Sequence, residues 1–325
     1  MRCCVIGAGA IGGYLAARLA LAGVEVRVVA RGANLAALQQ HGLILRDASG
    51  EQQIRLAQVS DDPHQLGSQD LVILAVKAQQ IRAALPTLVA LTGPDTIILP
   101  AQNGIPWWYF QKHGGPYEGQ SLHSVDPDGL ISRTINPDQV IGCVVYPATE
   151  LVAPALIQHL EGDRFSLGEL DGARTERIQQ VSQLFARAGL KAPIRTRIRA
   201  DIWVKLWGNL AFNPISALTR ATLGQICSFP PTRQLAAAMM AEAQQVAERL
   251  GISFPISIEQ RIDGAAQIGE HKTSMLQDIE ARRTTEIDAL AGSVSELGRI
   301  VGVPTPHIDA ITAAVQLLER HQSAA

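Results

Sequence analysis

The chain contains 325 residues, of which 47% are hydrophobic and 18% are charged. This length favours two domains, and the composition is typical of a soluble globular protein with a large core. The formal net charge of -2 argues against a protein that binds nucleic acid or an anionic membrane surface.

The cysteines and the apolar runs bear on the cell compartment. No spacing typical of metal ligands or of a disulfide framework occurs among the four cysteines, Cys3, Cys4, Cys143 and Cys227. We therefore expect no metal site and a reduced, cytoplasmic location. The apolar run from Arg2 to Ala22 loosely imitates a secretory leader, but its ordered glycines have a better explanation. Elsewhere no apolar run reaches the roughly 18 residues of a membrane span.

The N-terminal segment has the pattern of a dinucleotide-binding fold. An apolar strand over Arg2–Ile6 leads into a GxGxxG motif and then a helical pattern through Leu21. Gly23 ends that helix, and a second strand is expected over Glu25–Ala30. Strand, motif, helix and strand in this order within about 30 residues are a strong signal. The expected pyrophosphate-binding residues are Gly7, Gly9, Ala10, Ile11 and Gly12.

Each glycine of the motif has a physical reason. Gly7 allows a tight turn, Gly9 lets the backbone approach a pyrophosphate, and Gly12 permits close packing of helix on strand. The amide groups and the dipole at the helix N-terminus attract the phosphates.

Arg31 indicates which dinucleotide binds. Sites selective for NAD carry Asp or Glu at the end of the second strand, to bond the ribose 2′-hydroxyl. This chain has Ala30-Arg31 there, and an arginine suits the 2′-phosphate of NADP(H). A solvated surface arginine is the alternative interpretation.

Two further apolar runs, Asp70–Val76 and Thr96–Leu99, predict buried strands of the same parallel sheet. Lys77 and Asn103 follow them, at the carboxyl ends of strands, where open α/β sheets bind ligands. Asn103-Gly104 is equally well explained as a plain turn.

The stretch from Ile105 to Asp138 is rich in Gly and Pro and contains the aromatic cluster Trp107–Phe110. It predicts an inserted loop over a cleft, or a subunit contact. The segments that follow predict short strands at Val140–Tyr146, Leu156–Leu160 and Arg164–Leu167, a helix over Arg174–Ala188 and a last strand near Ala192–Arg195. The first domain is thus expected to span residues 1–197.

The rest of the chain, 198–325, predicts an all-helical domain, so the expected class is α/β with a helical C-terminal domain. Its first helix, Asp201–Ser216, is apolar except for a polar stripe at Lys205, Asn209 and Asn213. A lysine on a buried helix indicates a polar cavity, unless it pairs with Asp201 and reaches solvent. Pro214 is expected to kink this helix where the stripe ends. Further helices are expected at Thr232–Leu250, Ser257–Ile268 and Ser274–Val301.

Three blocks together resemble the ketopantoate reductase family over the whole chain. They are the GAGAIGG opening, the Lys205–Asn209–Asn213-Pro214 helix, and the pair of segments KTSMLQD (272–278) and RTTEID (283–288). The resemblance implies an NADPH-dependent reduction of the 2-keto acid ketopantoate to pantoate, in pantothenate synthesis. A homodimer is compatible with this family.

The resemblance also implies roles for individual residues. Lys205 matches the proton donor, Glu286 the carboxylate that binds the substrate hydroxyl, and Ser274 a hydroxyl near the substrate carboxylate. Asn209 and Asn213 match carboxamides beside the lysine. The matches on the cofactor side are the nicotinamide and ribose–phosphate contacts Asn103 and Lys77, and the 2′-phosphate arginine, Arg31.

General chemistry agrees with those roles. Hydride addition to a ketone leaves an alkoxide, which needs a cation that can deliver a proton, and burial lowers the pKa of a lysine toward the working range. The alternatives are that Ser274 and Gln277 form a capping box and that Glu286 pairs with Arg282 or Arg283. Two other functions stay open: a reductase of a different 2-keto acid with the same lysine, and a non-catalytic NADPH sensor.

Overall fold

The computed structural model describes residues 1–324, which form two compact units. The first contains Met1–Gln102, Phe110–Gln120 and Leu130–Ile198. The second contains Asn103–Tyr109, Ser121–Gly129 and the chain from Arg199 onward. The expected division after residue 197 lies beside the last of these transitions, whereas the stretch from 103 to 129 alternates between the units.

A parallel sheet forms the centre of the first unit, in the strand order β5-β2-β1-β6-β7. The strands are β1 (Cys3–Ile6), β2 (Val26–Val29), β5 (Gln58–Ser60), β6 (Gln69–Leu74) and β7 (Thr92–Pro100). Helices α1 (Ala10–Leu21), α2 (Gly32–His41) and α3 (Ile81–Leu91) and the 3-10 turns η1 (Pro63–Gln65) and η2 (Ala78–Gln80) lie between them in the chain. Because β2 and β6 lie on opposite sides of β1, the Rossmann-type arrangement is confirmed.

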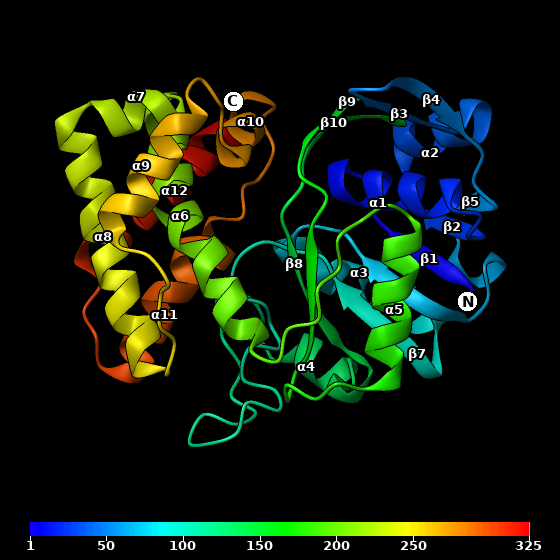
Figure 1. The fold of residues 1–325 in the computed structure, drawn as a ribbon, viewed down its shortest axis with the longest axis horizontal. Helices are drawn as coiled ribbons and strands as arrows, with labels where there is room; N and C mark the ends of the chain where they lie inside the picture. Colours follow the sequence, from blue (N-terminus) through cyan, green and yellow to red (C-terminus); the bar gives the residue numbers. More distant parts are fainter. Residues whose placement is uncertain (325) are drawn as a thin grey trace. The chain divides into compact units, whose positions relative to one another are not determined.

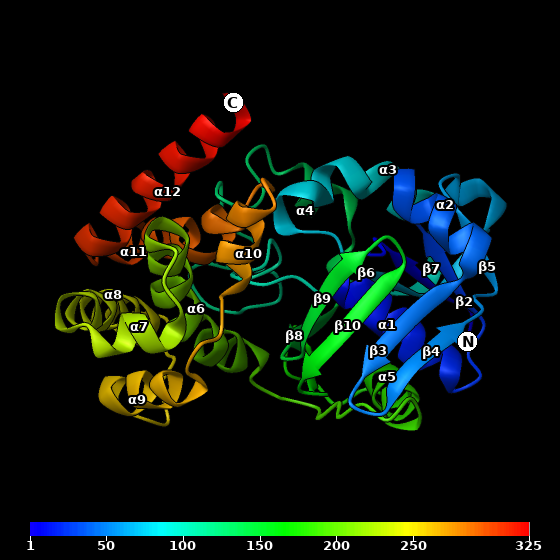
Figure 2. The ribbon, with the colours of Figure 1, turned by 90° about the horizontal axis from the view of Figure 1, so that it is seen from above.

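A second sheet covers α1, so that this helix packs against sheets on two sides (Figure 2). Its order is β4-β3-β10-β9, and the strands are β3 (Leu43–Asp47), β4 (Gly50–Ile54), β9 (Ala148–Ala153) and β10 (Leu156–Glu161). Gly13 permits the close approach, because a Cβ at this position would lie 2.6 Å from Ile157 Cδ1. The sequence had predicted only β10 of this sheet.

The remaining strands of the first unit, β8 (Ile141–Val145) and β11 (Phe165–Glu169), pair antiparallel, and a bridge from Val140 to Ile98 connects them to β7. These two strands and the helix α5 (Glu176–Arg187) were predicted. The short helix α4 (Leu130–Thr134) and the 3-10 turn η3 (Pro137–Gln139), which precede β8, were not. Near the predicted strand Ala192–Arg195 the chain pairs in parallel with β11 and the residue before it, but only through isolated bridges at Lys191 and Ile194 and not as a full strand.

Helices make up the second unit, as expected (Figure 1). They are α6 (Ile198–Thr219), α7 (Leu223–Ser228), α8 (Pro230–Arg249), α9 (Ile258–Ile268), α10 (Ser274–Glu280), the π-helix η4 (Asp288–Gly292), α11 (Ser293–Val301) and α12 (Pro306–Ala324). Four details differ from prediction. The helices α7 and α12 were not among those expected. The helix α6 continues through Pro214 to Thr219, and the segment Ser274–Val301 is not one helix, because an irregular stretch separates α10 from the π-helix.

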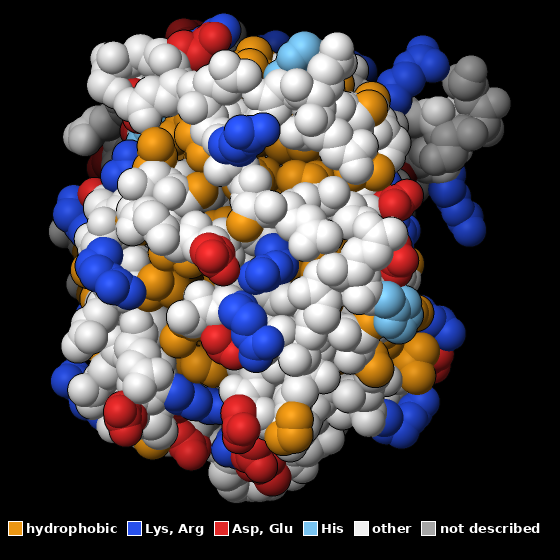
Figure 3. Space-filling view, turned by 90° about the vertical axis from the view of Figure 1, so that its right-hand side faces the viewer, with side chains coloured by type: hydrophobic (Ala, Val, Ile, Leu, Met, Phe, Trp, Pro, Cys, Tyr) orange, Lys and Arg blue, Asp and Glu red, His pale blue; other side chains and the backbone are white. Residues whose placement is uncertain are grey.

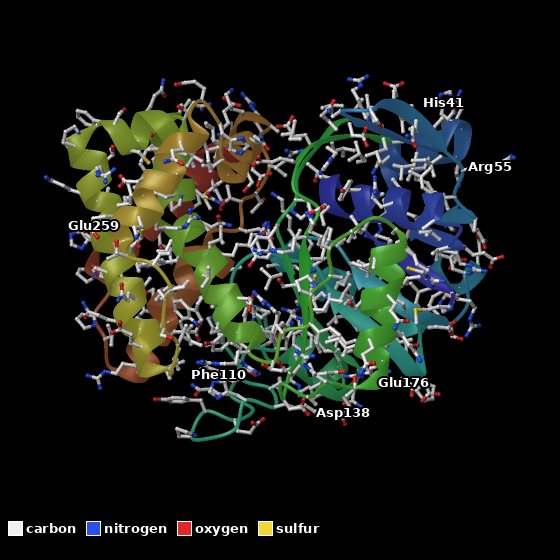
Figure 4. The ribbon with its side chains drawn as sticks, in the orientation of Figure 1. His41, Arg55, Phe110, Asp138, Glu176 and Glu259 are labelled. Atoms are coloured by element: carbon white, nitrogen blue, oxygen red, sulfur yellow. The ribbon has the colours of Figure 1, made fainter. Side chains whose placement is uncertain are left out.

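The aromatic cluster Trp107–Phe110 is part of the core. Trp107 and Trp108 are 2% and 1% exposed, and Tyr109 and Phe110 are fully buried. Trp203 Nε1 donates to the Tyr109 hydroxyl at 2.7 Å. Phe110, which is labelled in Figure 4, packs against the Tyr117 ring at a centroid distance of 5.5 Å. The expectation that these four side chains form a subunit contact is therefore wrong, whereas residues 105–129 are irregular, in agreement with the expected loop.

The surface carries charges of both signs, and the thiols are buried. On the face shown in Figure 3, basic and acidic side chains are interspersed. Across residues 1–324, no helix combines the length and the apolar character that a bilayer crossing needs. Buried free thiols are found at Cys3, Cys4, Cys143 and Cys227.

Candidate active site

The glycine loop after β1 is shaped to receive a phosphate group. Gly7 has a φ of +97°, and a Cβ at Gly12 would lie 1.9 Å from the Gly7 carbonyl oxygen, so both positions require glycine. A Cβ at Gly9 would instead meet open space. The backbone at Gly9 is therefore open to a ligand, beside the N-terminal turn of α1 that holds Ala10 and Ile11. The loop fits a pyrophosphate.

Asn34 holds this loop in place and was not singled out by the sequence. Its Nδ2 donates to the Ala8 carbonyl oxygen at 2.5 Å, and its Oδ1 accepts from the Ala155 amide at 2.7 Å. Fixing the Ala8 carbonyl also fixes the direction of the Gly9 N–H, because the peptide between them is planar. In the sequence Asn34 is only one polar residue in the first turn of α2, three residues after Arg31.

Arg31 and Lys77 stand at the carboxyl ends of the two strands that flank β1. Arg31 is exposed and is the N-cap residue of α2, while Lys77 is partly buried and precedes η2. Because β1, β2 and β6 are parallel, both residues lie at the same edge of the sheet as the glycine loop.

In the second unit, three polar residues from distant parts of the sequence form a hydrogen-bonded chain. Lys205 Nζ donates to Asn103 Oδ1 at 2.5 Å, and Asn103 Nδ2 donates to Glu286 Oε2 at 3.2 Å. The chain places an ammonium and a carboxylate on the two ends of one carboxamide. Sequence reasoning had grouped Asn103 with the cofactor residues and not with this pair.

The backbone after Asn103 explains how that side chain is held. Gly104 has a φ of +86°, and a Cβ there would lie 2.3 Å from the Ala289 carbonyl oxygen of the π-helix. The next amide, that of Ile105, donates to the same oxygen at 2.8 Å. The turn interpretation of Asn103-Gly104 is thus compatible with a site, because the turn packs Asn103 beside the Glu286 segment.

The polar stripe on α6 continues toward α10. Asn213 is 6% exposed, and its Nδ2 donates to Ser274 Oγ at 3.5 Å, while Asn209 lies between Lys205 and Asn213 and is partly buried. Ser274 does not cap α10. The N-cap is Thr273, whose Oγ1 accepts from the Leu276 amide at 3.2 Å. The Ser274 hydroxyl therefore does not cap the helix and can bind a ligand.

The alternative partners of Glu286 have a different arrangement. Arg283 Nε donates to Asp278 Oδ1 at 3.2 Å, which occupies one of the two arginines that could have paired with Glu286 on a common helix. Arg282 has a φ of +52° and follows the end of α10. The cluster of the second unit therefore offers a proton donor, a hydrogen-bond-accepting carboxylate and neutral donors.

The chain matches the family models described as "Ketopantoate reductase PanE/ApbA" over residues 3–113 and "Ketopantoate reductase PanE/ApbA C terminal" over residues 197–319. It is 53% identical over 319 residues to a 2-dehydropantoate 2-reductase of Mesorhizobium japonicum, with 98% of each chain covered.

Solved structures agree with this match. A putative ketopantoate reductase from Ralstonia solanacearum is 44% identical, with a TM-score of 0.95 and 99% and 98% of the two chains covered. A 2-dehydropantoate 2-reductase from Methylococcus capsulatus is 28% identical, with a TM-score of 0.83 and the same coverage.

Proposed function

Because the chain belongs to the ketopantoate reductase family, we propose that it reduces 2-dehydropantoate (ketopantoate) to pantoate with NADPH, in pantothenate (vitamin B5) and coenzyme A biosynthesis. The observation that carries the proposal is the hydrogen-bonded chain Lys205–Asn103–Glu286. The relative with 53% identity is a 2-dehydropantoate 2-reductase, which supports this substrate over another 2-keto acid.

Lys205 is the proton donor in this proposal. NADPH, when bound, supplies the hydride that reduces the C2 carbonyl of the keto acid. As negative charge develops on the carbonyl oxygen, the Lys205 ammonium stabilises it and transfers a proton to it, which completes the alcohol. The Asn103 carboxamide oxygen accepts from Lys205 Nζ and so orients the ammonium for this transfer.

The neighbouring polar groups hold the substrate. Glu286 accepts a hydrogen bond from the substrate hydroxyl, and Ser274, Asn209 and Asn213 offer donors to its carboxylate without adding positive charge. The 3.5 Å contact between Asn213 and Ser274 supports their action on one ligand group. A non-catalytic NADPH sensor would not require a proton donor and substrate-binding groups arranged together.

On the cofactor side, the loop residues Gly7, Gly9, Ala10, Ile11 and Gly12 bind the pyrophosphate. Arg31 binds the 2′-phosphate and thereby selects NADP(H) over NAD(H), Lys77 contacts the ribose–phosphate part, and Asn103 contacts the nicotinamide as well as Lys205. The open space at Gly9 and the shared edge of the sheet support these assignments.

We assign residues 1–197 to the NADP-binding domain and 198–325 to the substrate-binding and catalytic domain, with Asn103–Tyr109 and Ser121–Gly129 belonging to the second compact unit. We also propose a cytoplasmic homodimer. The buried thiols fit a reducing compartment, and the assembly is testable by light scattering on the purified protein.

The test of the function is NADPH oxidation by the purified protein with ketopantoate and with a panel of other 2-keto acids. We expect kcat/KM for ketopantoate to exceed that for pyruvate, 2-ketoisovalerate and benzoylformate. A higher kcat/KM for one of the other acids would make that acid the assigned substrate. If no acid supported NADPH oxidation, the reductase assignment would be refuted.

A further inference from the structure

Glu286 lies at the junction between an irregular stretch and the π-helix η4. The helix α10 ends at Glu280, and residues 283–286 have no regular secondary structure before the helical turn that opens the π-helix η4. The Glu286 carbonyl oxygen accepts from the Leu290 amide at 2.9 Å, which ties this residue to the π-helix on its C-terminal side, whereas no helix holds it on its N-terminal side. The irregular stretch before Glu286 is held by side chains from elsewhere in the second unit.

Two side chains of α12 provide such partners on either side of Glu286. Glu319 Oε1 accepts from the Thr285 amide at 2.5 Å, and Gln316 Nε2 donates to Asp288 Oδ1 at 2.7 Å. Glu319 and Gln316 are three residues apart, so they project from the same face of the helix.

The hydrogen bond between Glu319 and Thr285 is partly buried. Thr285 is 3% exposed, and its Oγ1 accepts from the Ile287 amide at 3.2 Å. The Thr285 side chain thus joins the residue before Glu286 to the residue after it. Glu319 in turn accepts from the backbone amide of Thr285. A shift of Thr285 would carry Glu286 with it.

The helix α12 is itself anchored independently of these contacts. The carboxylate of Glu242, in α8, accepts from the His307 and Ile308 amides at 3.0 Å each, at the start of α12. Thr305 Oγ1 donates to Asp309 at 3.2 Å in the same turn. Substitutions at residues 316 and 319 leave this end of the helix intact, so they test position and not folding.

We propose that Glu319 and Gln316 are positioning residues, which set the Glu286 carboxylate against Asn103 and the substrate hydroxyl. The inference rests on the proposed function, because it concerns the same catalytic cluster. The Asn103–Glu286 distance is 3.2 Å, so a displacement of about 1 Å would take it beyond hydrogen-bond range. Displacements of that size at an active site can lower turnover by up to about a hundredfold.

The experiment compares Glu319→Ala, Glu319→Gln and Gln316→Ala with Arg320→Ala, a control at the next, exposed residue of α12. We expect Glu319→Ala to lower kcat/KM for ketopantoate about tenfold and Gln316→Ala about threefold. Glu319→Gln should recover most of the loss, because a glutamine carbonyl oxygen can accept from the Thr285 amide. The Kd of NADPH should stay within about twofold in all of them.

Hydrogen exchange supplies a readout that does not depend on the substrate. The peptide that contains Thr285 should exchange faster in Glu319→Ala than in the parent and in Arg320→Ala, and Glu319→Gln should restore its protection. Equal exchange in Glu319→Ala and the control overturns the proposal, whichever acid the enzyme reduces.

The kinetic outcomes are equally decisive. If the parent reduces ketopantoate and Glu319→Ala matches the control, the positioning role fails and the proposed function stands. A loss of NADPH affinity equal to the loss of kcat/KM also overturns it, since that would indicate general damage. A parent that does not reduce ketopantoate refutes the function instead, and exchange at Thr285 then decides on the anchor alone.

Discussion

Lys205 and Asn103 are 102 residues apart in sequence, and their side chains meet at 2.5 Å. The contact also settles which way the Asn103 carboxamide points. A lysine can only donate and an ionised carboxylate can only accept, so the oxygen of Asn103 faces Lys205 and its nitrogen faces Glu286. The three groups form a directed chain of donors and acceptors.

The proton-donor role of Lys205 predicts a selective loss of turnover. Lys205→Met removes the ammonium and keeps an unbranched apolar side chain, so kcat should fall at least about a hundredfold. NADPH titration of the same variant by fluorescence should give a Kd near that of the parent. Comparable losses of kcat and of NADPH affinity would refute the assignment.

The role of Arg31 predicts a change in cofactor preference. Arg31→Ala removes a charged donor for the 2′-phosphate, and such hydrogen bonds contribute about 1.5–3 kcal/mol. The ratio of kcat/KM for NADPH to that for NADH should therefore fall about tenfold or more, with little effect on the NADH value. Steady-state kinetics with both cofactors tests this, and an unchanged ratio would remove Arg31 from the site.

The ion pair of Arg177 with Glu169 predicts a large effect on stability in the first unit. Arg177 Nε donates to Glu169 Oε1 at 2.8 Å, and Glu169 is 3% exposed, so Arg177→Met leaves a buried carboxylate without its cation. The cost should be about 3 kcal/mol. Urea unfolding measures it against Arg174→Met, an exposed control that should cost less than about 0.5 kcal/mol. Equal midpoints for both variants would contradict the prediction.

Asp70 predicts part of the response to acid. The side-chain hydrogen bond from Arg2, together with its backbone amide, holds the pKa of Asp70 below the ordinary 3.8. A carboxyl whose pKa is lowered by folding stabilises the protein above its unfolded pKa, and that contribution is lost as pH falls through the folded pKa. The Tm of Asp70→Asn should thus lie below the parent's at neutral pH and approach it below about pH 4. A constant gap across this range would exclude the mechanism.

The part of the fold that the sequence predicted depends on local signals. The strands β1, β2, β6 and β7 are nearly continuous apolar runs, and such runs stay recognisable because a parallel sheet buries both faces. Leu43–Asp47 and Gly50–Ile54 carry polar residues, and the first of them pairs with β10 through contacts more than 100 residues away in the chain. A local sequence pattern cannot predict pairing between strands that are so distant in the chain.

The candidate site shows the same limit. Lys205, Asn209 and Asn213 were found because one helix spaces them regularly, whereas the link from Lys205 through Asn103 to Glu286 depends on tertiary packing. A kink was expected at Pro214, and α6 continues past it to Thr219. Asn34 and Glu319 act on backbone groups, and nothing in a single sequence distinguishes them from other polar residues of a helix.

The four buried thiols can report on local unfolding through the rate at which they are alkylated. Burial raises the pKa of Cys4 to about 12 and also raises the pKa of Cys227, so neither reacts readily with an alkylating reagent in the folded state. Cys3, Cys4 and Cys143 belong to the first unit and Cys227 to the second. Alkylation rates read by mass spectrometry would therefore follow the unfolding of each unit separately, without any introduced label.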